Sequence, residues 1–345
     1  MCRSIIGGPP KTSYTLHRTS PSEAMVGKPS AHAHPALTQR GGGAYNGRAS
    51  HAESMPMCAN AGLWGMLPVV PTSCAICGRS EGATVHTDRT PGAANLFRII
   101  RCPCGILYVN PAPAPGALAE YYARYETYYD PAVTARVNSD EEMMRRAGRD
   151  LSRIERWRSP GTLLDVGCGR GHFLVAARER GWKVSGTELG CASDLDARVK
   201  LASAMLHQGE LATLTGRETF DVVSLREVLE HVADPRQTLA EARRLLKPSG
   251  VLFCHVPNVG GLRIRLRRKP MASQLHLWHF TPRTLQYLLG AGGFRVLEIG
   301  FQDHRAIAAP LWRRILREAR VRAENALLHL GGNLGTIIYA VACRR

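Results

Sequence analysis

Long apolar runs are missing from this sequence of 345 residues. No stretch approaches the roughly 18 apolar residues that a membrane-spanning helix needs. The mildly apolar segment 61–70 contains Pro68 and lies far from the first residue, so it does not have the form of a secretory signal peptide. We therefore expect no membrane span and no secretion signal, and we predict a cytoplasmic protein.

Acidic residues are scarce, with 28 Asp and Glu against 45 Lys and Arg and a formal net charge of +17. An excess of this size is compatible with binding to nucleic acid or to an anionic membrane. The basic, partly amphipathic segments 262–269 and 311–330 would suit peripheral membrane contact. We favour arginines spread over solvated faces in all of these cases, because net charge informs association and not fold.

The cysteines are too unevenly placed for a disulfide scaffold. Four of the ten gather in one region, at Cys74, Cys77, Cys102 and Cys104, and the other six are scattered singly. Small secreted domains held by disulfides are shorter and more evenly supplied with cysteine. The pattern favours a reducing compartment and one possible metal site.

The sequence divides into four regions. Residues 1–70 are rich in Gly, Pro, Ser, Ala and His without a helix or strand period, which predicts a disordered extension. Residues 71–112 carry the four clustered cysteines and short β-like runs. The proline-rich stretch 110–115 should stop regular structure, since proline fixes φ and removes a donor. Residues 113–160 then read as a helical linker or cap with a run of tyrosines that we interpret as a packing face, and residues 161–345 as the main domain.

From residue 161 strands alternate with helices. The expected strands are 162–166, 183–188, 204–207, 220–225, 251–256 and 295–300, and the expected helices are 172–180, 194–201, 235–246 and 281–289. Lys-Pro-Ser-Gly250 should end the third helix. Such alternation predicts crossover connections and a parallel sheet covered on both faces.

The most informative stretch is Leu163-Leu-Asp-Val-Gly-Cys-Gly-Arg-Gly-His172, in which an apolar strand is followed by glycines and then a helix. Glycines allow a tight turn and close contact between a ligand and the backbone. Their G-x-G-x-G spacing differs from the G-x-G-x-x-G of pyrophosphate sites. Asp165 before the loop would repel pyrophosphate but suit a cationic ligand. Glu188 ends the next strand, where an acid can accept hydrogen bonds from two ribose hydroxyls.

On these residues, the region 161–300 resembles the class I S-adenosylmethionine-dependent methyltransferases. The resemblance implies a Rossmann-like α/β fold whose sheet has seven mostly parallel strands. It also implies S-adenosylmethionine as the cofactor, with the methionine part on the glycine loop, the ribose on Glu188, and Glu210 facing the adenine. The implied cofactor residues are Asp165, Gly167, Cys168, Gly169, Gly171, Glu188, Leu189, Glu210 and Arg226.

The segment 220–232 resembles the motif around strand four of this family. Its Leu-Glu-His-Val step is typical of small-molecule methyltransferases, including the ubiquinone-type O-methyltransferases, and the signatures of base methylation are missing. A hydroxyl or acidic-carbon acceptor needs a proton acceptor near pH 7, which favours histidine. The candidate bases are His231, His276 and His279, with a structural hydrogen bond as the alternative for each. Sugar, quinone-precursor, polyketide and lipid acceptors, with O- or C-methylation, all remain open.

The cysteine region resembles the N-terminal zinc ribbon of many such enzymes, down to the Cys104-Gly-Ile-Leu-Tyr-Val-Asn-Pro111 tail. The second pair, Cys102-Pro-Cys104, lacks one spacer residue. The resemblance implies one structural zinc on the four cysteines, since four sulfurs leave no open position. The alternative is a ribbon that has lost its metal.

Two other functions compete with small-molecule methylation. An RNA methyltransferase would use the ribbon and the basic surface to bind nucleic acid, but we find no basic stripe interleaved with aromatic residues in the ribbon. A non-catalytic binding module is less favoured, because the cofactor loop is intact. We expect a small-molecule acceptor and no nucleic-acid partner.

Overall fold

The computed structural model describes residues 67–88, 97–124, 139–189, 205–261, 276–302, 311–328 and 335–345. The predicted extension 1–70 lies almost wholly outside the described residues, as do the predicted helix 194–201, the basic segment 262–269 and most of the tyrosine run.

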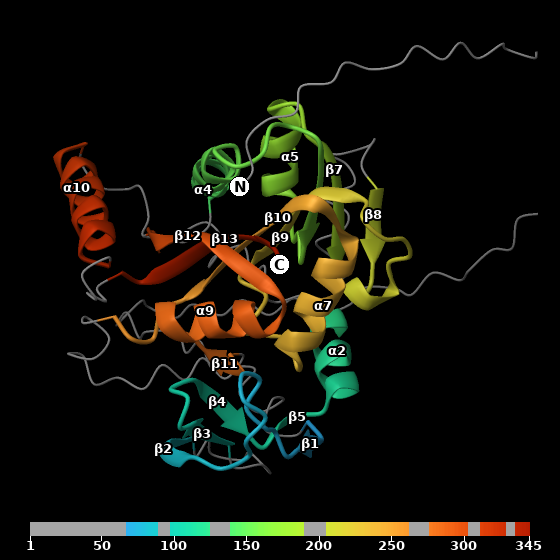
Figure 1. The fold of residues 1–345 in the computed structure, drawn as a ribbon, viewed down its shortest axis with the longest axis vertical. Coiled ribbons are helices and arrows are strands. Elements are labelled where there is room, and N and C mark those ends of the chain that lie inside the picture. Colours follow the sequence, from blue (N-terminus) through green and yellow to red (C-terminus); the bar gives the residue numbers. More distant parts are fainter. Residues whose placement is uncertain are drawn as a thin grey trace, which may run out of the picture. The chain divides into compact units, whose positions relative to one another are not determined.

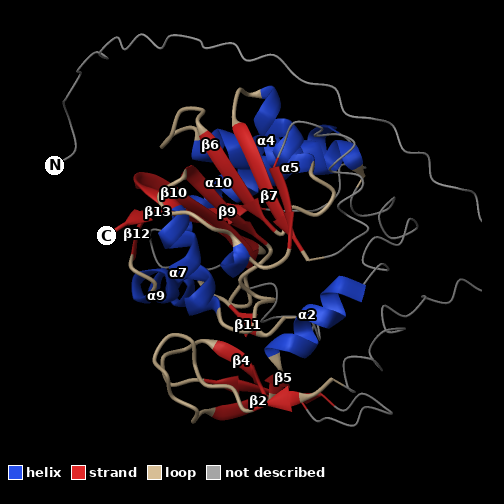
Figure 2. Ribbon diagram, turned by 90° about the vertical axis from the view of Figure 1, so that its right-hand side faces the viewer, coloured by secondary structure: helices blue, strands red, loops and turns tan. Residues whose placement is uncertain are grey.

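The larger of the sheets in the described residues has seven strands in the order β12-β13-β10-β9-β6-β7-β8 (Figures 1 and 2). Its strands are β6 (Thr162–Val166), β7 (Lys183–Glu188), β8 (Met205–Gln208), β9 (Phe220–Arg226), β10 (Leu246–Pro257), β12 (Phe294–Gln302) and β13 (Ile337–Arg344). The pairs from β8 through β10 are parallel, and β13 is antiparallel to both of its neighbours. The expected seven-stranded, mostly parallel sheet is therefore confirmed.

Helices cover both faces of this sheet (Figure 2). They are α4 (Asp140–Ile154), α5 (His172–Glu179), α7 (Pro235–Leu245), α9 (Pro282–Ala291) and α10 (Leu311–Leu328), with a short 3-10 turn η2 (Leu211–Thr213). The buried side chains of β6 alternate between two core layers: Leu163 packs with α4 and α5, and Leu164 with α7 and α9. This period-two alternation is what a strand buried on both faces must show.

Local capping explains where three of these helices begin. The Ser139 hydroxyl accepts from the backbone N–H of Glu142 at the start of α4, and Asp234 accepts from two N–H groups of α7. Thr281 and Thr284 form a reciprocal capping box at α9. Such caps satisfy N–H groups that have no partner within the helix.

One predicted boundary is wrong. Lys-Pro-Ser-Gly250 is predicted to end the third helix, and α7 does end at Leu245, but the strand predicted to begin at Val251 already begins at Leu246 as β10. Leu246 pairs with Phe220, and Lys247 donates to Asp221, so β9 holds this stretch before the register shifts at Val251. The prediction that the prolines of 110–115 interrupt regular structure is also wrong in part. Ala112 and Pro113 form the short strand β5, which pairs with β1 (Val69–Val70).

The cysteine region forms a four-stranded antiparallel sheet of β2 (Ala83–Asp88), β3 (Phe97–Arg101), β4 (Leu107–Asn110) and β11 (Trp278–His279). Its edge strand β11 comes from the segment that follows β10, almost 170 residues along the chain from β4. The Trp278 ring stacks on Tyr108 with ring centroids 5.8 Å apart. The helix α2 (Pro115–Arg124) follows β5, and its Tyr121 is buried in the same core cluster.

In the part of the chain that the structure describes, no helix combines the length and the apolar character that crossing a membrane requires.

Candidate active site

The glycine loop leaves the carboxyl end of β6 with a backbone that side chains rarely tolerate. Gly167, Gly169 and Gly171 have φ values of +66°, +51° and +76°, all in the left-handed region. A Cβ on Gly167 would lie 3.2 Å from Cγ2 of Val228, which belongs to the turn after β9. The alternating glycines of the motif are therefore required by the turn itself, and they bring it against the next functional segment.

Glu188, at the end of β7, holds this loop from the side. Its carboxylate accepts one hydrogen bond from the Gly169 N–H and one from the Leu189 N–H, both at 2.9 Å. Cys168 donates its backbone N–H to Thr187 O at 2.9 Å. A Cβ on Gly186 would meet the Cys168 sulfur at 2.9 Å, so glycine at 186 makes room for it. The acid predicted for a ribose thus lies beside the glycines predicted for the methionine part.

Asp165 is the buried acid of the site. Only 2% of it is exposed, and its Oδ1 has no hydrogen-bond partner. Burial raises the pKa of Asp165 to about 7, although the nearby Arg226 opposes this. A carboxyl held in this way would be stabilised in its charged form by a cationic ligand.

Arg226 and Glu210 lie in different surroundings. Arg226, the last residue of β9, donates its Nε–H to Asp150 of α4 at 3.1 Å, and its guanidinium covers the Phe173 ring. Glu210 is exposed just after β8, and the preceding Gly209 donates to the backbone oxygen of Glu188. No local pattern in the sequence points to Asp150, because its partner lies 76 residues away.

The three predicted histidines lie together. The rings of His231 and His276 are 4.7 Å apart, and those of His276 and His279 are 6.4 Å apart. His231 follows β9, His276 lies just before β11, and His279 is the last residue of β11. Burial lowers the pKa of His276 to about 3 and that of His279 to about 4, so both are neutral at pH 7 and weak as free bases.

Two members of this cluster were missed as functional residues. The Tyr122 hydroxyl, from α2, lies 2.9 Å from Nδ1 of His231. Glu230 is 1% exposed, neither of its carboxylate oxygens has a hydrogen-bond partner, and burial raises its pKa well above the usual range. Glu230 stands inside the Leu-Glu-His-Val step, so the motif contained it, whereas nothing local marked Tyr122 among its neighbours.

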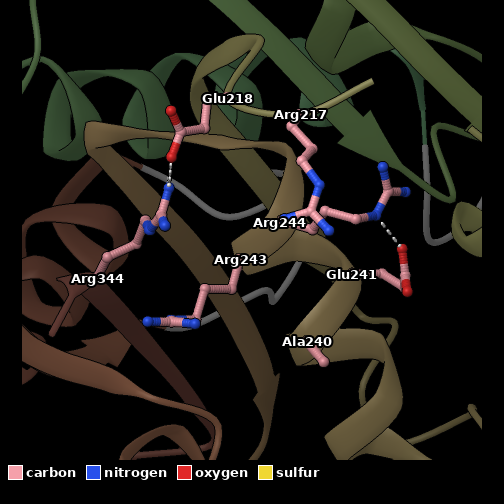
Figure 3. Close-up of a pocket in the computed structure, with 7 residues that line it drawn as sticks. All are labelled: Arg217, Glu218, Ala240, Glu241, Arg243, Arg244 and Arg344. Atoms are coloured by element: carbon pink, nitrogen blue, oxygen red, sulfur yellow. Dashed lines mark hydrogen bonds and ion pairs between the residues drawn. The ribbon is translucent and has the colours of Figure 1, made fainter. Parts of the chain in front are cut away.

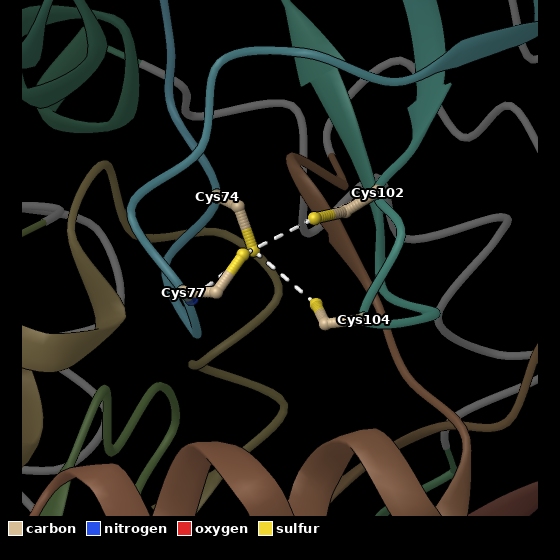
Figure 4. Close-up of side chains that lie close together, drawn as sticks. All are labelled: Cys74, Cys77, Cys102 and Cys104. Atoms are coloured by element: carbon tan, nitrogen blue, oxygen red, sulfur yellow. Dashed lines mark hydrogen bonds between the residues drawn. The ribbon is translucent and has the colours of Figure 1, made fainter.

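The four cysteine sulfurs converge in the ribbon (Figure 4). The Cys74 and Cys104 sulfurs are 3.5 Å apart and those of Cys77 and Cys102 are 3.4 Å apart. A tetrahedral zinc with Zn–S bonds of about 2.3 Å would separate its sulfurs by about 3.8 Å. Each cysteine pair is followed by a glycine with positive φ, Gly78 or Gly105, whose N–H bonds back to the first cysteine carbonyl. The shorter Cys-x-Cys spacing therefore still forms a turn that presents both sulfurs.

A separate hollow lies at the carboxyl end of α7 (Figure 3). It is lined by Arg217, Glu218, Ala240, Glu241, Arg243, Arg244 and Arg344. Arg244 pairs with Glu241 at 2.6 Å and Arg344 with Glu218 at 2.8 Å. Basic side chains in the last turn of a helix are stabilised by the helix dipole, which accounts for two of the arginines without a ligand.

Known proteins resemble the chain over this region. Residues 139–299 match the family described as "Methyltransferase domain". The ubiquinone biosynthesis O-methyltransferase of Pseudomonas paraeruginosa is 37% identical over 110 residues, covering 28% of this chain and 44% of that protein. The enzyme of the same name from Saccharophagus degradans is 36% identical over 97 residues, covering 26% and 41%. The chain thus spans less than half the length of these relatives.

Solved structures also resemble it. The 1,6-didemethyltoxoflavin-N1-methyltransferase of Burkholderia thailandensis is 17% identical, with a TM-score of 0.47 over 74% of this chain and 98% of that one. The sheet order, the glycine loop at the end of β6 and the matched family agree with one another. The region that matches this family therefore has a Rossmann-like fold, with a seven-stranded, mostly parallel sheet and helices on both faces.

Proposed function

We propose that this protein transfers a methyl group from S-adenosylmethionine to a small-molecule acceptor. The observation that carries the proposal is the junction at the carboxyl edge of the sheet. There Glu188 bonds to the glycine loop, and the same loop abuts Val228 in the turn that leads to the histidine cluster. This contact would bring the proposed cofactor site and the proposed acceptor site together, as methyl transfer requires.

The residues fit the cofactor. S-adenosylmethionine supplies a methyl group on a positively charged sulfonium, a good leaving group. The unpartnered oxygen of Asp165 and its raised pKa suit a cationic ligand, and the glycines leave the backbone open to close approach. Glu188 would exchange its bonds with the loop for bonds with ribose hydroxyls. Glu210 and Arg226 would act at the edge of the site, Glu210 toward the adenine and Arg226 through its charge on Asp165.

On the acceptor side, we assign the removal of the acceptor's proton to the cluster of His231, His276 and His279. His231 is the central member, since Tyr122 orients its ring. His279 is only 3% exposed, and His231 and His276 are half-buried. Trp278, next to His279, stacks on Tyr108 of the ribbon, so the cluster is partly enclosed. This burial favours a small acceptor over a polymer, and the names of the relatives support O-methylation of a quinone precursor.

We also assign one structural zinc to Cys74, Cys77, Cys102 and Cys104. The zinc would tie the two turns of the ribbon together and leave no position for substrate. Metal analysis of purified protein should return this zinc, and Cys77→Ser should lose it. A folded, active protein free of zinc would contradict the assignment.

The test of the function is label transfer from methyl-labelled S-adenosylmethionine. The full chain is incubated with a small-metabolite extract and, separately, with total RNA, at two salt concentrations. We expect label in small molecules with little dependence on salt. Label only in RNA, falling steeply with salt, would instead support a nucleic-acid enzyme.

A further inference from the structure

We propose that the hollow at the carboxyl end of α7 binds a phosphate group, either as the free anion or as part of a small phosphate monoester. The inference goes beyond the proposed function, because this hollow is separate from the proposed methyl-transfer site. The helix α7 begins at Pro235, shortly after the turn that carries His231, and ends at Leu245 beside the hollow. A helix of 11 residues is about 16 Å long, which separates the hollow from the histidine cluster.

The hollow carries more positive charge than its own acids balance. Four arginines and two glutamates line it, which leaves a net charge of +2. Each glutamate pairs with one arginine, at 2.8 and 2.6 Å. The other two arginines, Arg217 and Arg243, have no carboxylate partner among the described residues, and Figure 3 shows no dashed line at either side chain. These two unbalanced guanidinium groups match the charge of about −1.5 to −2 that a phosphate monoester carries at pH 7.

Arg243 gives the clearest sign of a missing partner. Its Nε atom is buried and has no hydrogen-bond partner in the described part of the chain. Buried N–H donors ordinarily bond to protein, water or a ligand. The side chain lies along Gly293, where a Cβ would come within 3.1 Å of Nε, so glycine at this position leaves room for it. A phosphate oxygen would supply the acceptor that this guanidinium lacks.

The other two lining arginines are fixed by the backbone. Arg244 donates to the carbonyl oxygen of Gly216 and, at 2.8 Å, to that of Leu214. Arg344 donates to the carbonyl oxygen of Leu246 at 2.9 Å. These bonds hold the two guanidinium groups in place before a ligand binds, which lowers the entropic cost of binding.

The end of α7 opposes an anion less than a free helix end would. The carboxyl end of a helix ordinarily presents unpaired carbonyl groups and a partial negative charge. Here the last two carbonyl oxygens of α7 accept hydrogen bonds from the N–H groups of Glu218, at 3.0 Å, and Thr219, at 2.8 Å. The helix dipole accounts for the basic residues of the last turn, but not for Arg217, which comes from the loop before β9.

The lining favours phosphate over other anions. A guanidinium group can donate two parallel hydrogen bonds to a carboxylate or a phosphate. Arg217 and Arg243 can share the oxygens and the two charges of a phosphate, whereas a single carboxylate would leave one positive charge unbalanced. The hollow has a volume of about 170 Å³, below the roughly 300–1,000 Å³ of pockets for drug-sized ligands. It therefore suits a phosphate group or a small monoester and not a whole nucleotide.

Calorimetry on the full chain tests the site. Inorganic phosphate, glycerol 3-phosphate and acetate are each titrated into the wild-type protein at low salt. We expect saturable binding of one phosphate or one glycerol 3-phosphate per chain, and no saturable heat from acetate. Tighter binding of glycerol 3-phosphate would identify a monoester as the ligand, and equal or weaker binding would identify the free anion.

Variants assign the binding to the hollow. Arg217→Gln and Arg243→Gln should each weaken phosphate binding about 10-fold to 100-fold, because each removes charge-assisted hydrogen bonds. The matched control is Arg236→Gln, an exposed arginine in the first turn of the same helix, which should keep the affinity of wild type. Arg217 is exposed, so its substitution should leave the melting temperature unchanged and report on binding alone.

Three results would overturn the inference. The first is a wild-type chain that binds neither phosphate nor glycerol 3-phosphate. The second is equal weakening in Arg217→Gln and Arg236→Gln, which would show a general attraction of anions to a basic chain. The third is binding of a short RNA without binding of either small ligand. Affinity for S-adenosylhomocysteine, measured in the same preparations, tests the proposed function separately and should be equal in all of these proteins.

Discussion

The proposed cofactor side and the proposed acceptor side of this domain are built in different ways. The glycine loop and Glu188 lie on adjacent parallel strands within 24 residues, and they touch through one hydrogen bond. The acceptor side is assembled from three distant segments, namely α2, the turn after β9, and β11 with the residues just before it. A compact motif fixes its own geometry through its backbone. A convergent cluster depends on the packing of the whole domain, so the two sides should respond differently to substitution.

The largest expected effect is on the acceptor side. His231→Ala should lower the rate of methyl transfer roughly 10²-fold to 10⁴-fold, because it removes the central group of proton removal. Affinity for S-adenosylhomocysteine should stay within twofold. His86→Ala, on β2 of the ribbon, is the matched control and should keep the rate. An unchanged rate in His231→Ala would mean that the proton leaves elsewhere.

On the cofactor side, substitution should lower cofactor affinity, the quantity that the acceptor-side variant leaves unchanged. Glu188→Ala should weaken S-adenosylhomocysteine binding at least about 100-fold, since each of the two hydrogen bonds to the charged group contributes roughly 1.5–3 kcal/mol. Calorimetry measures this directly, with Glu241→Ala, a carboxylate in the distant hollow, as the control. Equal affinity in Glu188→Ala and wild type would remove the ribose assignment and with it the contrast between the two sides.

The pH dependence of stability should differ between two aspartates of the same sheet. The folded pKa of Asp165 is about 7, above its unfolded value, so the folded chain keeps a proton that the unfolded chain has released. Its stabilising contribution is present at pH 4 and is lost as the pH rises through 7. Asp165→Asn should therefore be more stable than wild type above pH 7, by up to roughly 4 kcal/mol, and not at pH 4.

Asp221 provides the reversed comparison. Burial alone would raise its pKa, but hydrogen bonds from Lys247 and Thr162 outweigh that effect and lower it. Its contribution is present above the unfolded pKa and is lost as the pH falls, so Asp221→Asn should be least stable relative to wild type near neutral pH. Denaturant melts of both variants from pH 4 to 8 check the two trends. If the stabilities of the two variants relative to wild type changed in the same direction with pH, the surroundings described for the two aspartates would be wrong.

The smallest effect concerns the junction between the two sides. Gly167→Ala forces a side chain into the left-handed region, which costs roughly 1–2 kcal/mol, and brings its Cβ to 3.2 Å from Val228. Cofactor affinity and transfer rate should both fall. Gly116→Ala, in α2 with open space around it, should leave both unchanged. If Gly167→Ala affects neither quantity, the loop does not couple the two sites.

The sequence predicted the local geometry of the glycine loop better than the long-range packing around the histidine cluster, for a physical reason. Glycine spacing and a strand-terminal acid are local features, and the structure has Gly167, Gly169 and Glu188 in the expected places. Two strand pairings join segments that are far apart in the sequence: β11 with β4, and the antiparallel β13 with β10. No local pattern in the sequence predicts either pairing. The contacts of Tyr122 and Asp150 could not be predicted locally, because their partners lie 109 and 76 residues away.

Direct titration of the cofactor tests the central claim most closely. S-adenosylhomocysteine and NAD are each titrated by calorimetry into the full chain, and S-adenosylhomocysteine into Glu188→Ala. We predict saturable binding of one S-adenosylhomocysteine per chain, no heat from NAD, and strongly reduced affinity in the variant. Binding of NAD in place of S-adenosylhomocysteine, or binding of neither, would contradict the assignment of this domain as a working methyltransferase.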